Sequence, residues 1–175
     1  MSIESLRIKK LDSVHYYVRD LARHRSLFVD QLDFGVVGAS TDAMTQAGKQ
    51  RSEVLQAGDC AFVFIEPEGQ GGRAWRYLRK HPDGVGALVF EVEDIEHTFA
   101  LLDARGGTII DDVQTHQDDG GTLRTFSITT PFGDCTFRFV ERRGYRAFFP
   151  GFDAYDPPRG GTNRFGFGRI DHITS

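Results

Sequence analysis

The sequence is poor in cysteine, methionine and tryptophan, with two, two and one of them in 175 residues. Two cysteines, Cys60 and Cys135, are too few for a disulfide framework and fit a reducing compartment, so we expect a cytoplasmic protein. No apolar run approaches the roughly 20 residues that a membrane-spanning helix needs. The amino terminus also lacks the apolar stretch of a secretory signal. The sequence therefore predicts neither a membrane partner nor export.

An excess of one charge is also missing. The chain carries 21 Lys and Arg against 25 Asp and Glu, a net charge of −4, and the two signs are interspersed. Without an excess of positive charge we expect no nucleic-acid partner. A hydrophobic fraction of 39% and a charged fraction of 26% are typical of a globular protein with its own core.

Glycine and phenylalanine are abundant instead, with 20 and 15 residues, and an internal repeat accounts for part of this. GDCAFVFIE at 58–66 returns as GDCTFRFVE at 133–141, which is 75 residues later. VRDL at 18–21 matches VEDI at 92–95 with an offset of 74. Two independent matches at nearly the same offset predict two copies of a unit of about 75 residues.

Each copy has the pattern of one strand, one helix and three further strands. Asp20 and Asp94 follow the opening strands, and each can begin a helix because its carboxylate accepts bonds from free backbone N–H groups. Helical spacing relates the apolar residues Leu21, Phe28, Val29 and Leu32 in the first copy and Ile95, Phe99 and Leu102 in the second. Strands are expected at 14–18, 34–37, 52–56 and 61–65, and again at 88–92, 108–113, 122–129 and 136–140.

This order of elements predicts an α+β fold of tandem βαβββ units that form a curved mixed sheet, with the helices on one side. Gly35 and the pair Gly106–Gly107 are expected to end the two helices in a left-handed conformation. A further short helix is expected at 73–80, between the copies. We expect residues 1–143 to form an amino-terminal domain, with its two units at about 11–66 and 85–141.

The composition changes after this domain. Residues 144–168 hold six glycines, three prolines and five phenylalanines. Glycine and proline predict a long irregular connector, and the aromatic residues indicate that it packs against the protein. The IDHI sequence at 170–173 then repeats the LDSV sequence at 11–14. Residues 169–175 are therefore expected to be the first strand of a truncated carboxy-terminal catalytic domain.

Three stretches connect the chain to a known family: HPDGVGALVFEVED at 81–94, FFPGF at 148–152 and GRIDHITS at 168–175. With the tandem units, they make the chain similar to the amino-terminal half of the 4-hydroxyphenylpyruvate dioxygenase and hydroxymandelate synthase family. This family belongs to the vicinal oxygen chelate superfamily, which has the glyoxalase-like fold. The resemblance runs from about Leu11 to the end and implies a complete protein roughly twice as long.

The resemblance implies an Fe(II)-dependent dioxygenase that converts an aromatic 2-oxo acid, 4-hydroxyphenylpyruvate, and O₂ into homogentisate and CO₂, a step of tyrosine catabolism. Such enzymes hold iron through two histidines and one carboxylate. The corresponding positions in this half are Ser13, Ala87 and Glu141, of which Glu141 alone is a usual ligand. We therefore expect this half to hold no metal and to be inactive alone.

Glu141 is expected to be a strand-end carboxylate at the surface, paired with Arg142 or Arg143, and Glu66 takes the equivalent place in the first copy. His172 occupies the same position in its strand as Ser13 and Ala87. An ordinary strand histidine would explain it from the sequence alone, whereas the resemblance implies that His172 is the first iron ligand. The other two ligands would then lie beyond Ser175.

Other polar residues have simpler interpretations. The remaining histidines have no common spacing suited to a metal and are expected to lie at the surface or to form hydrogen bonds. Cys60 and Cys135 occupy equivalent repeat positions and are expected to be small buried residues. The strands expected at 61–65 and 136–140 alternate Phe62 and Phe64, and Phe137 and Phe139, on one face, which predicts a packed interior.

Two alternatives remain beside the dioxygenase. Hydroxymandelate synthase oxidises the benzylic carbon of the same substrate, and by the resemblance the residues that decide between the two products lie in the carboxy-terminal domain. A different class is a non-catalytic, small-molecule-binding protein of the glyoxalase and bleomycin-resistance kind, which would need an open pocket lined by the phenylalanines. A homo-oligomer is expected in either case.

Overall fold

The computed structural model of the chain describes residues 4–174. The first residues of the predicted amino-terminal domain, 1–3, and the last residue of the predicted strand, Ser175, lie outside the described residues. The chain divides into two compact units. The amino-terminal unit comprises Ser13–Gly86 and the chain from Ala147 onward, and the central unit comprises the chain up to Asp12 and Ala87–Arg146.

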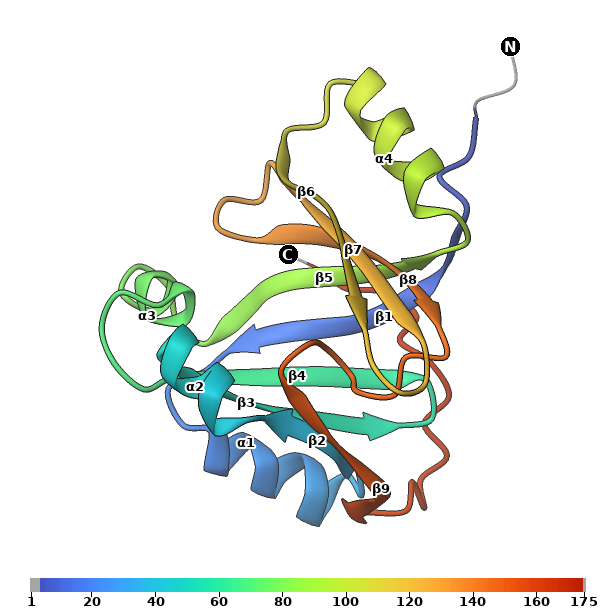
Figure 1. Cartoon of the computed structure of the whole chain (residues 1–175). Helices are drawn as coiled ribbons and strands as arrows, with labels where there is room; N and C mark the ends of the chain where they lie inside the picture. The colour runs from blue at the N-terminus through green and yellow to red at the C-terminus, as the bar shows by residue number, and fades with distance from the viewer. Residues whose placement is uncertain (1–3, 175) are drawn as a thin grey trace. The chain divides into compact units, whose positions relative to one another are not determined.

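The amino-terminal unit contains one copy of the predicted pattern, with additions. Its strands follow the order β1-β4-β3-β2-β9 across the sheet, and β1 runs parallel to β4 while the other neighbours are antiparallel (Figure 1). Its elements are β1 (Ile8–Tyr17), α1 (Leu21–Ser26), the π-helical turn η1 (Leu27–Gln31), β2 (Gly35–Ser40), α2 (Asp42–Gly48), β3 (Gln50–Ala57), β4 (Cys60–Pro67), α3 (Arg73–Leu78) and β9 (Phe152–Gly160). The first residues of β1 belong to the central unit.

The central unit contains the second copy. Its strand order is β6-β7-β8-β5, and β5 runs parallel to β8. Its elements are β5 (Gly84–Val92, from Ala87 onward), α4 (Ile95–Ala104), β6 (Ile109–Gln117), β7 (Thr122–Thr129) and β8 (Thr136–Arg143). Both units therefore have the βαβββ order, and the predicted α+β fold class is confirmed.

Both helix starts are capped as the sequence predicted. The Asp20 carboxylate accepts a bond from the Arg23 N–H at 2.9 Å, and the Asp94 carboxylate accepts one from the His97 N–H at 3.1 Å. The left-handed residue after the first helix is Asp33, with φ of +61°, so the prediction for Gly35 was wrong. Gly106, with φ of +80°, confirms the prediction for the second helix.

Each unit buries the apolar face of its helix against its sheet. In the amino-terminal unit, the residues of α1 and η1 that share helical spacing pack on Phe34, Leu55 and Phe64. In the central unit, Ile95, Phe99 and Leu102 pack on Phe126 and Phe139. The predicted helix faces are confirmed in both copies.

Two elements were not predicted. In α2, the Thr41 hydroxyl accepts a bond from the Met44 N–H at 3.2 Å and caps the helix. Strand β9 lies inside the segment predicted as irregular and pairs with β2, so that part of the prediction was wrong. Its Pro157 and Pro158 masked the strand in the sequence, but an outer strand tolerates proline because one of its edges needs no partner.

The expected packing of the connector is confirmed, because Tyr155 and Phe167 lie against the core of the amino-terminal unit. In contrast, residues 161–174 form no helix or strand, so the strand expected at 169–175 is absent from the described part of the chain. The Asp59 N–H donates to the Gly168 carbonyl at 2.7 Å, just before the predicted strand. None of the described helices has the length and apolarity needed to cross a membrane.

Replacing the buried Phe64 should destabilise the protein strongly. Its side chain is 1% exposed and its ring contacts Tyr16, His24, Phe28 and Phe62. We expect Phe64→Ala to lower the free energy of unfolding by about 3–5 kcal/mol, since truncation removes buried area and leaves a cavity. Phe165→Ala is the matched control, because Phe165 is 57% exposed, and its change should stay within about 0.5 kcal/mol. Urea unfolding measures both, and equal losses would contradict the assignment of the core.

Candidate functional site

Each sheet has one face that packs against its own helix and one that does not. In the central unit, Phe90 and Val92 of β5 lie on the face covered by α4. Side chains alternate along a strand, so Ala87, Val89 and Glu91 point to the opposite face. In the amino-terminal unit, Tyr16 and Val18 of β1 lie on the helix-covered face.

Ser13 and Ala87, two positions that the family resemblance assigned to iron ligands, lie on the faces away from the helices. Both are buried, and the Ser13 hydroxyl lies 3.4 Å from Nε2 of His15. The His15 ring is buried and stands edge-on to Phe149, with 5.1 Å between ring centroids. His15 is therefore a packed, hydrogen-bonded histidine, as one of the two sequence interpretations predicted.

Glu141 lies on the other face from Ala87. It follows Phe137 and Phe139 on the helix-covered side of β8, and its Oε2 accepts a bond from the Ile95 N–H at 2.9 Å, at the start of α4. Glu141 and Ala87 therefore do not form a pair of ligand positions on one surface. In this half, the Glu141 carboxylate lies on the opposite face of the sheet from Ala87.

The charge of Glu141 is paired, but not at the surface. Its Oε1 lies 2.6 Å from Nε of Arg143, which confirms one predicted partner, while the Glu141 side chain is only 5% exposed. The expected surface position was wrong, because the first N–H groups of α4 need an acceptor. Arg142, the other suggested partner, instead donates to both carboxylate oxygens of Asp12, at 2.8 and 3.2 Å.

Glu66 confirms the simpler interpretation of a strand-end carboxylate. It lies on the same side of β4 as Phe62 and Phe64, and its Oε2 accepts a bond from Nε of Arg51 at 2.5 Å. The two repeat-related glutamates therefore have the same structural task of holding a charged partner near a strand end.

His172 stands apart from these residues. Its side chain is 76% exposed, and its Nδ1 lies 2.9 Å from Oδ2 of Asp171. Among the described residues, no group of three or more His, Cys, Asp and Glu side chains could hold a metal ion. The residues present do not fit an iron site by themselves, because one histidine and one neighbouring carboxylate leave the two-histidine, one-carboxylate set unfilled.

A pair of residues that the sequence did not reveal anchors the chain ahead of His172. The Asp33 carboxylate accepts bonds from the Thr162 N–H and hydroxyl, both at 3.2 Å, and from the Arg164 N–H at 2.6 Å. The Asn163 side chain accepts from the Phe167 N–H at 2.8 Å and donates to the Phe167 carbonyl at 3.0 Å. These bonds fix residues 162–167 on the corner between η1 and β2. We call Asp33 and Asn163 the connector clamp.

The electrostatics of the connector clamp follow from its hydrogen bonds. The Arg164 N–H, then the Thr162 N–H and hydroxyl, hold the pKa of Asp33 below its usual range, since each favours the ionised carboxylate. Aspartate is one of the residues that most often adopt the left-handed conformation, so its presence at this turn does not by itself indicate a distant partner. Its partners lie about 130 residues further on, so no local pattern could show the contact.

The phenylalanine clusters are packed interiors, as predicted. Phe28, Phe34, Phe62 and Phe64 have ring centroids 4.9–5.8 Å apart in their closest pairs. Phe139 contacts Phe90 and Phe126 in the central unit in the same way. Two open grooves of the amino-terminal unit, about 610 and 510 Å³, are lined by other residues.

The cysteines differ slightly from each other. Cys60 is buried, and burial, with the charge of Asp59, raises the pKa of its thiol, which makes it a poor nucleophile. Cys135 is half-buried, with its Sγ 3.8 Å from the Thr136 carbonyl. The expectation of a buried residue holds fully for Cys60 and partly for Cys135.

Comparison with solved structures defines the class of fold. Methylmalonyl-CoA epimerase from Mycobacterium tuberculosis superposes with a TM-score of 0.66 at 17% sequence identity, over 81% of this chain and 93% of the epimerase chain. At that identity the likeness shows the fold alone. The fold is the glyoxalase-like one that the family resemblance implied.

The sequence comparison gives the family. Residues 10–134 match the model of the Glyoxalase/Bleomycin resistance protein/Dioxygenase superfamily, and the chain belongs to that superfamily.

The relatives within it are named as dioxygenases. A 4-hydroxyphenylpyruvate dioxygenase of Coccidioides posadasii is 29% identical over 155 residues, covering 81% of this chain and 38% of the relative. The one of Dictyostelium discoideum is 25% identical over 170 residues, covering 94% and 46%. The chain thus spans about two fifths of the length of the curated relatives it matches. The resemblance found in the sequence is confirmed.

Removing the charge of Asp33 should loosen the connector clamp. We expect Asp33→Asn to speed amide exchange at Thr162 and Arg164, measured by hydrogen exchange with mass spectrometry or NMR. The pKa of Asp33 is lowered in the folded state, so its stabilisation is present above the unfolded value of about 3.9 and is lost as the pH falls through the lower folded value. Asp153→Asn, at an exposed position of β9, is the control and should leave the exchange unchanged.

Glu141 should prove to be structural. We expect Glu141→Ala to lower the free energy of unfolding by about 1–3 kcal/mol, because the buried Ile95 N–H loses its acceptor. Glu141→Gln keeps an acceptor oxygen and should lose less. Unfolding in urea measures both variants. Unchanged midpoints would show that the start of α4 does not depend on this side chain.

Proposed function

We propose that the chain is the amino-terminal part of an Fe(II)-dependent dioxygenase similar to 4-hydroxyphenylpyruvate dioxygenase, and that it is inactive alone. The observation that carries the proposal is the alignment of dioxygenases over four fifths of the chain, which covers only 38–39% of the two first relatives. A longer protein would supply the remaining units. The substrates would be an aromatic 2-oxo acid and O₂, and the products homogentisate and CO₂.

Each segment expected from the sequence has its own role in the proposed enzyme. Residues 1–143 act as a scaffold, 144–168 as the connector, and 169–175 begin the catalytic domain. The packed phenylalanine cores and the buried pairs of Glu141 and Asp12 support a scaffold, because they stabilise the fold and present no reactive group. Bound iron would supply the activation of O₂ and the chelation of the 2-oxo acid.

His172 is the residue of this chain that we assign to the iron, as one of three ligands. The family resemblance of GRIDHITS at 168–175 supports the assignment, and the His172 side chain is exposed. The connector clamp holds the chain up to Phe167, five residues before His172. It therefore limits where the His172 imidazole can reach.

The two alternatives are less well supported. Hydroxymandelate synthase would use the same scaffold and remains the second enzyme candidate. A non-catalytic binding protein would need an open pocket between the phenylalanines, but their rings are in contact with each other. We also propose a cytoplasmic location, because two cysteines are too few for a disulfide framework.

Two measurements test the proposal. The 175-residue chain, given Fe(II), O₂ and 4-hydroxyphenylpyruvate, should form no homogentisate, measured by chromatography. The natural gene product should have an intact mass well above 19.6 kDa, should form homogentisate, and should lose bound iron, measured by elemental analysis, on His172→Ala. His116→Ala, in the central unit, is the control and should keep the iron.

Three results would overturn parts of it. Robust iron-dependent turnover by the short chain would refute its inactivity. A natural mass near 19.6 kDa would refute the larger protein. Hydroxymandelate as the product of the longer protein would favour the synthase.

A further inference from the structure

The chain around α3 is far more basic than the protein as a whole. Arg73, Arg76, Arg79 and Lys80 fall within eight residues, and Asp83 is the one acidic residue in 69–84. Asp83 already accepts a bond from Nη1 of Arg19 at 2.8 Å. The positive charge of this segment is therefore not cancelled within the segment.

Three of the nearby cations have no acidic partner within the described part of the chain. No carboxylate lies within 4.0 Å of Arg76, Arg79 or Lys49, whereas Arg51 nearby is paired with Glu66 and Glu68. Arg76 donates instead to the Gly71 carbonyl. The three cations are exposed to solvent.

A half-buried aromatic residue completes this surface. The Arg79 guanidinium lies over the ring of Trp75, 4.9 Å from its centroid, and Trp75 is the one tryptophan of the chain. We call Lys49, Trp75, Arg76 and Arg79 the basic surface. Tryptophan and arginine are the residues that most often contribute binding energy at protein interfaces.

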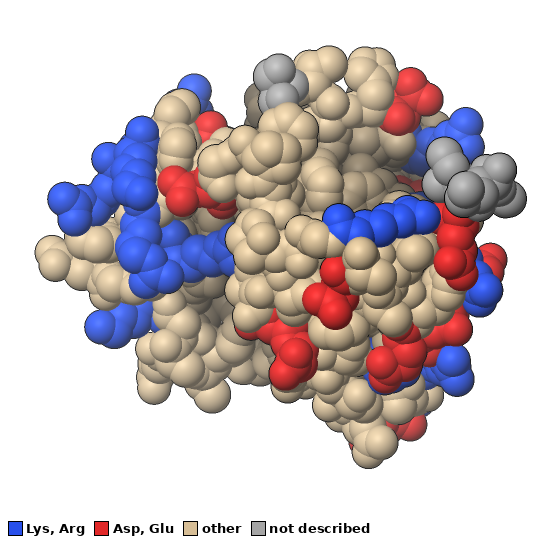
Figure 2. Space-filling view, turned by 90° about the horizontal axis from the view of Figure 1, so that it is seen from above, with Lys and Arg blue, Asp and Glu red and all other residues tan. Residues whose placement is uncertain are grey.

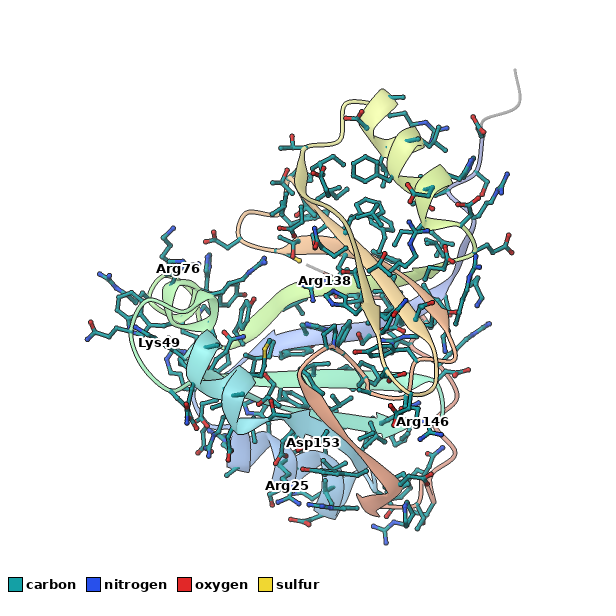
Figure 3. The ribbon with its side chains drawn as sticks, in the orientation of Figure 1. Arg25, Lys49, Arg76, Arg138, Arg146 and Asp153 are labelled. Carbon is teal, nitrogen blue, oxygen red and sulfur yellow. The ribbon has the colours of Figure 1, made fainter. Side chains whose placement is uncertain are left out.

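The members of the basic surface lie close together. A Cβ on Gly72, just before α3, would meet the Gly48 carbonyl at 2.8 Å, so the ends of α2 and α3 touch. Figure 2 shows Lys and Arg side chains gathered on the side where α2 and α3 lie in Figure 1. Figure 3 shows Arg76 on α3 and Lys49 at the neighbouring end of α2.

The acidic counterpart is found in the central unit of the same chain. That unit carries nine Lys and Arg against thirteen Asp and Glu, a net charge of −4, while the amino-terminal unit has twelve of each. Strand β6 is the outer strand of its sheet order, and it exposes Ile110, which is 43% accessible, beside Asp111 and Asp112. We call these three residues the acidic edge.

The acidic edge is suited to side-chain contacts rather than to strand addition. The pairing of β6 with β7 shifts register between Ile109 and Asp111 and again between Asp111 and Gln114. Bulges of this kind twist an edge away from a straight pairing geometry. Neither aspartate carboxylate has an ion-pair partner among the described residues. Both carboxylates and the Ile110 side chain are exposed to solvent.

We propose that the basic surface of one copy docks on the acidic edge of a second copy. Arg76 and Arg79 would face Asp111 and Asp112, and Trp75 would cover Ile110. A long polyanion such as a nucleic acid fits less well, because the chain has a net charge of −4 and the basic surface is small. The contact joins two different surfaces of the chain, one from each copy. It does not depend on the proposed enzymatic function.

Sedimentation of the whole 175-residue chain tests the interface. We expect association that grows with protein concentration and is lost at high salt, because exposed charges are screened. Arg76→Glu with Arg79→Glu should abolish it, and so should Asp111→Lys with Asp112→Lys. An equimolar mixture of the two double variants should associate again, since each reversed surface then meets its complement.

A matched control separates the surface from net charge. Arg23→Glu with Arg169→Glu changes the charge by the same amount at exposed positions, and it should leave the association unchanged. Circular dichroism shows whether a charge reversal unfolds the chain. If it does, the test is repeated with neutral variants, which are Arg76→Gln with Arg79→Gln and Asp111→Asn with Asp112→Asn. A monomer at every concentration, association that survives both reversals, or no rescue in the mixture would overturn the proposal. Tight binding of a nucleic-acid probe by a monomeric chain would overturn it as well.

Discussion

Successive side chains along a strand point to opposite faces of the sheet, and this alternation determines which residues are buried in both units. One face of each sheet packs against a helix, and the phenylalanines of β4 and β8 occupy that face. The hydrophobic effect then holds each helix on its sheet, because burying these rings removes large apolar areas from water. On these strands, a residue an even number of positions from a buried phenylalanine shares its face, and a residue an odd number of positions away lies on the opposite face.

The same alternation determines what each polar residue can do. Glu141 is two residues from Phe139 and so lies under α4, where it accepts the Ile95 N–H, while Ala87 lies on the other face. A ligand set that combines these two positions is therefore not available in this half. In this half, Glu141 therefore supports the fold through its hydrogen bond and its ion pair.

In the proposed enzyme, the connector would restrict the position of His172. Strand β9 extends the sheet of the amino-terminal unit, and the connector clamp of Asp33 and Asn163 ties down the chain that follows. The chain is therefore held at Phe167, five residues before His172. The basic surface and the acidic edge lie on other elements, the end of α2, α3 and β6, so the proposed association does not involve His172.

The repeat, the α+β class, the caps at Asp20 and Asp94 and the family resemblance could be predicted, because they depend on local patterns and on spacing along the chain. The burial of Glu141, the strand within the connector and the clamp at Asp33 became visible only in the folded chain. Each of these depends on partners 46 to 131 residues away or on a neighbouring sheet edge, and such contacts leave no periodic signal in the sequence. Distance along the chain separates what could be predicted from what had to be observed.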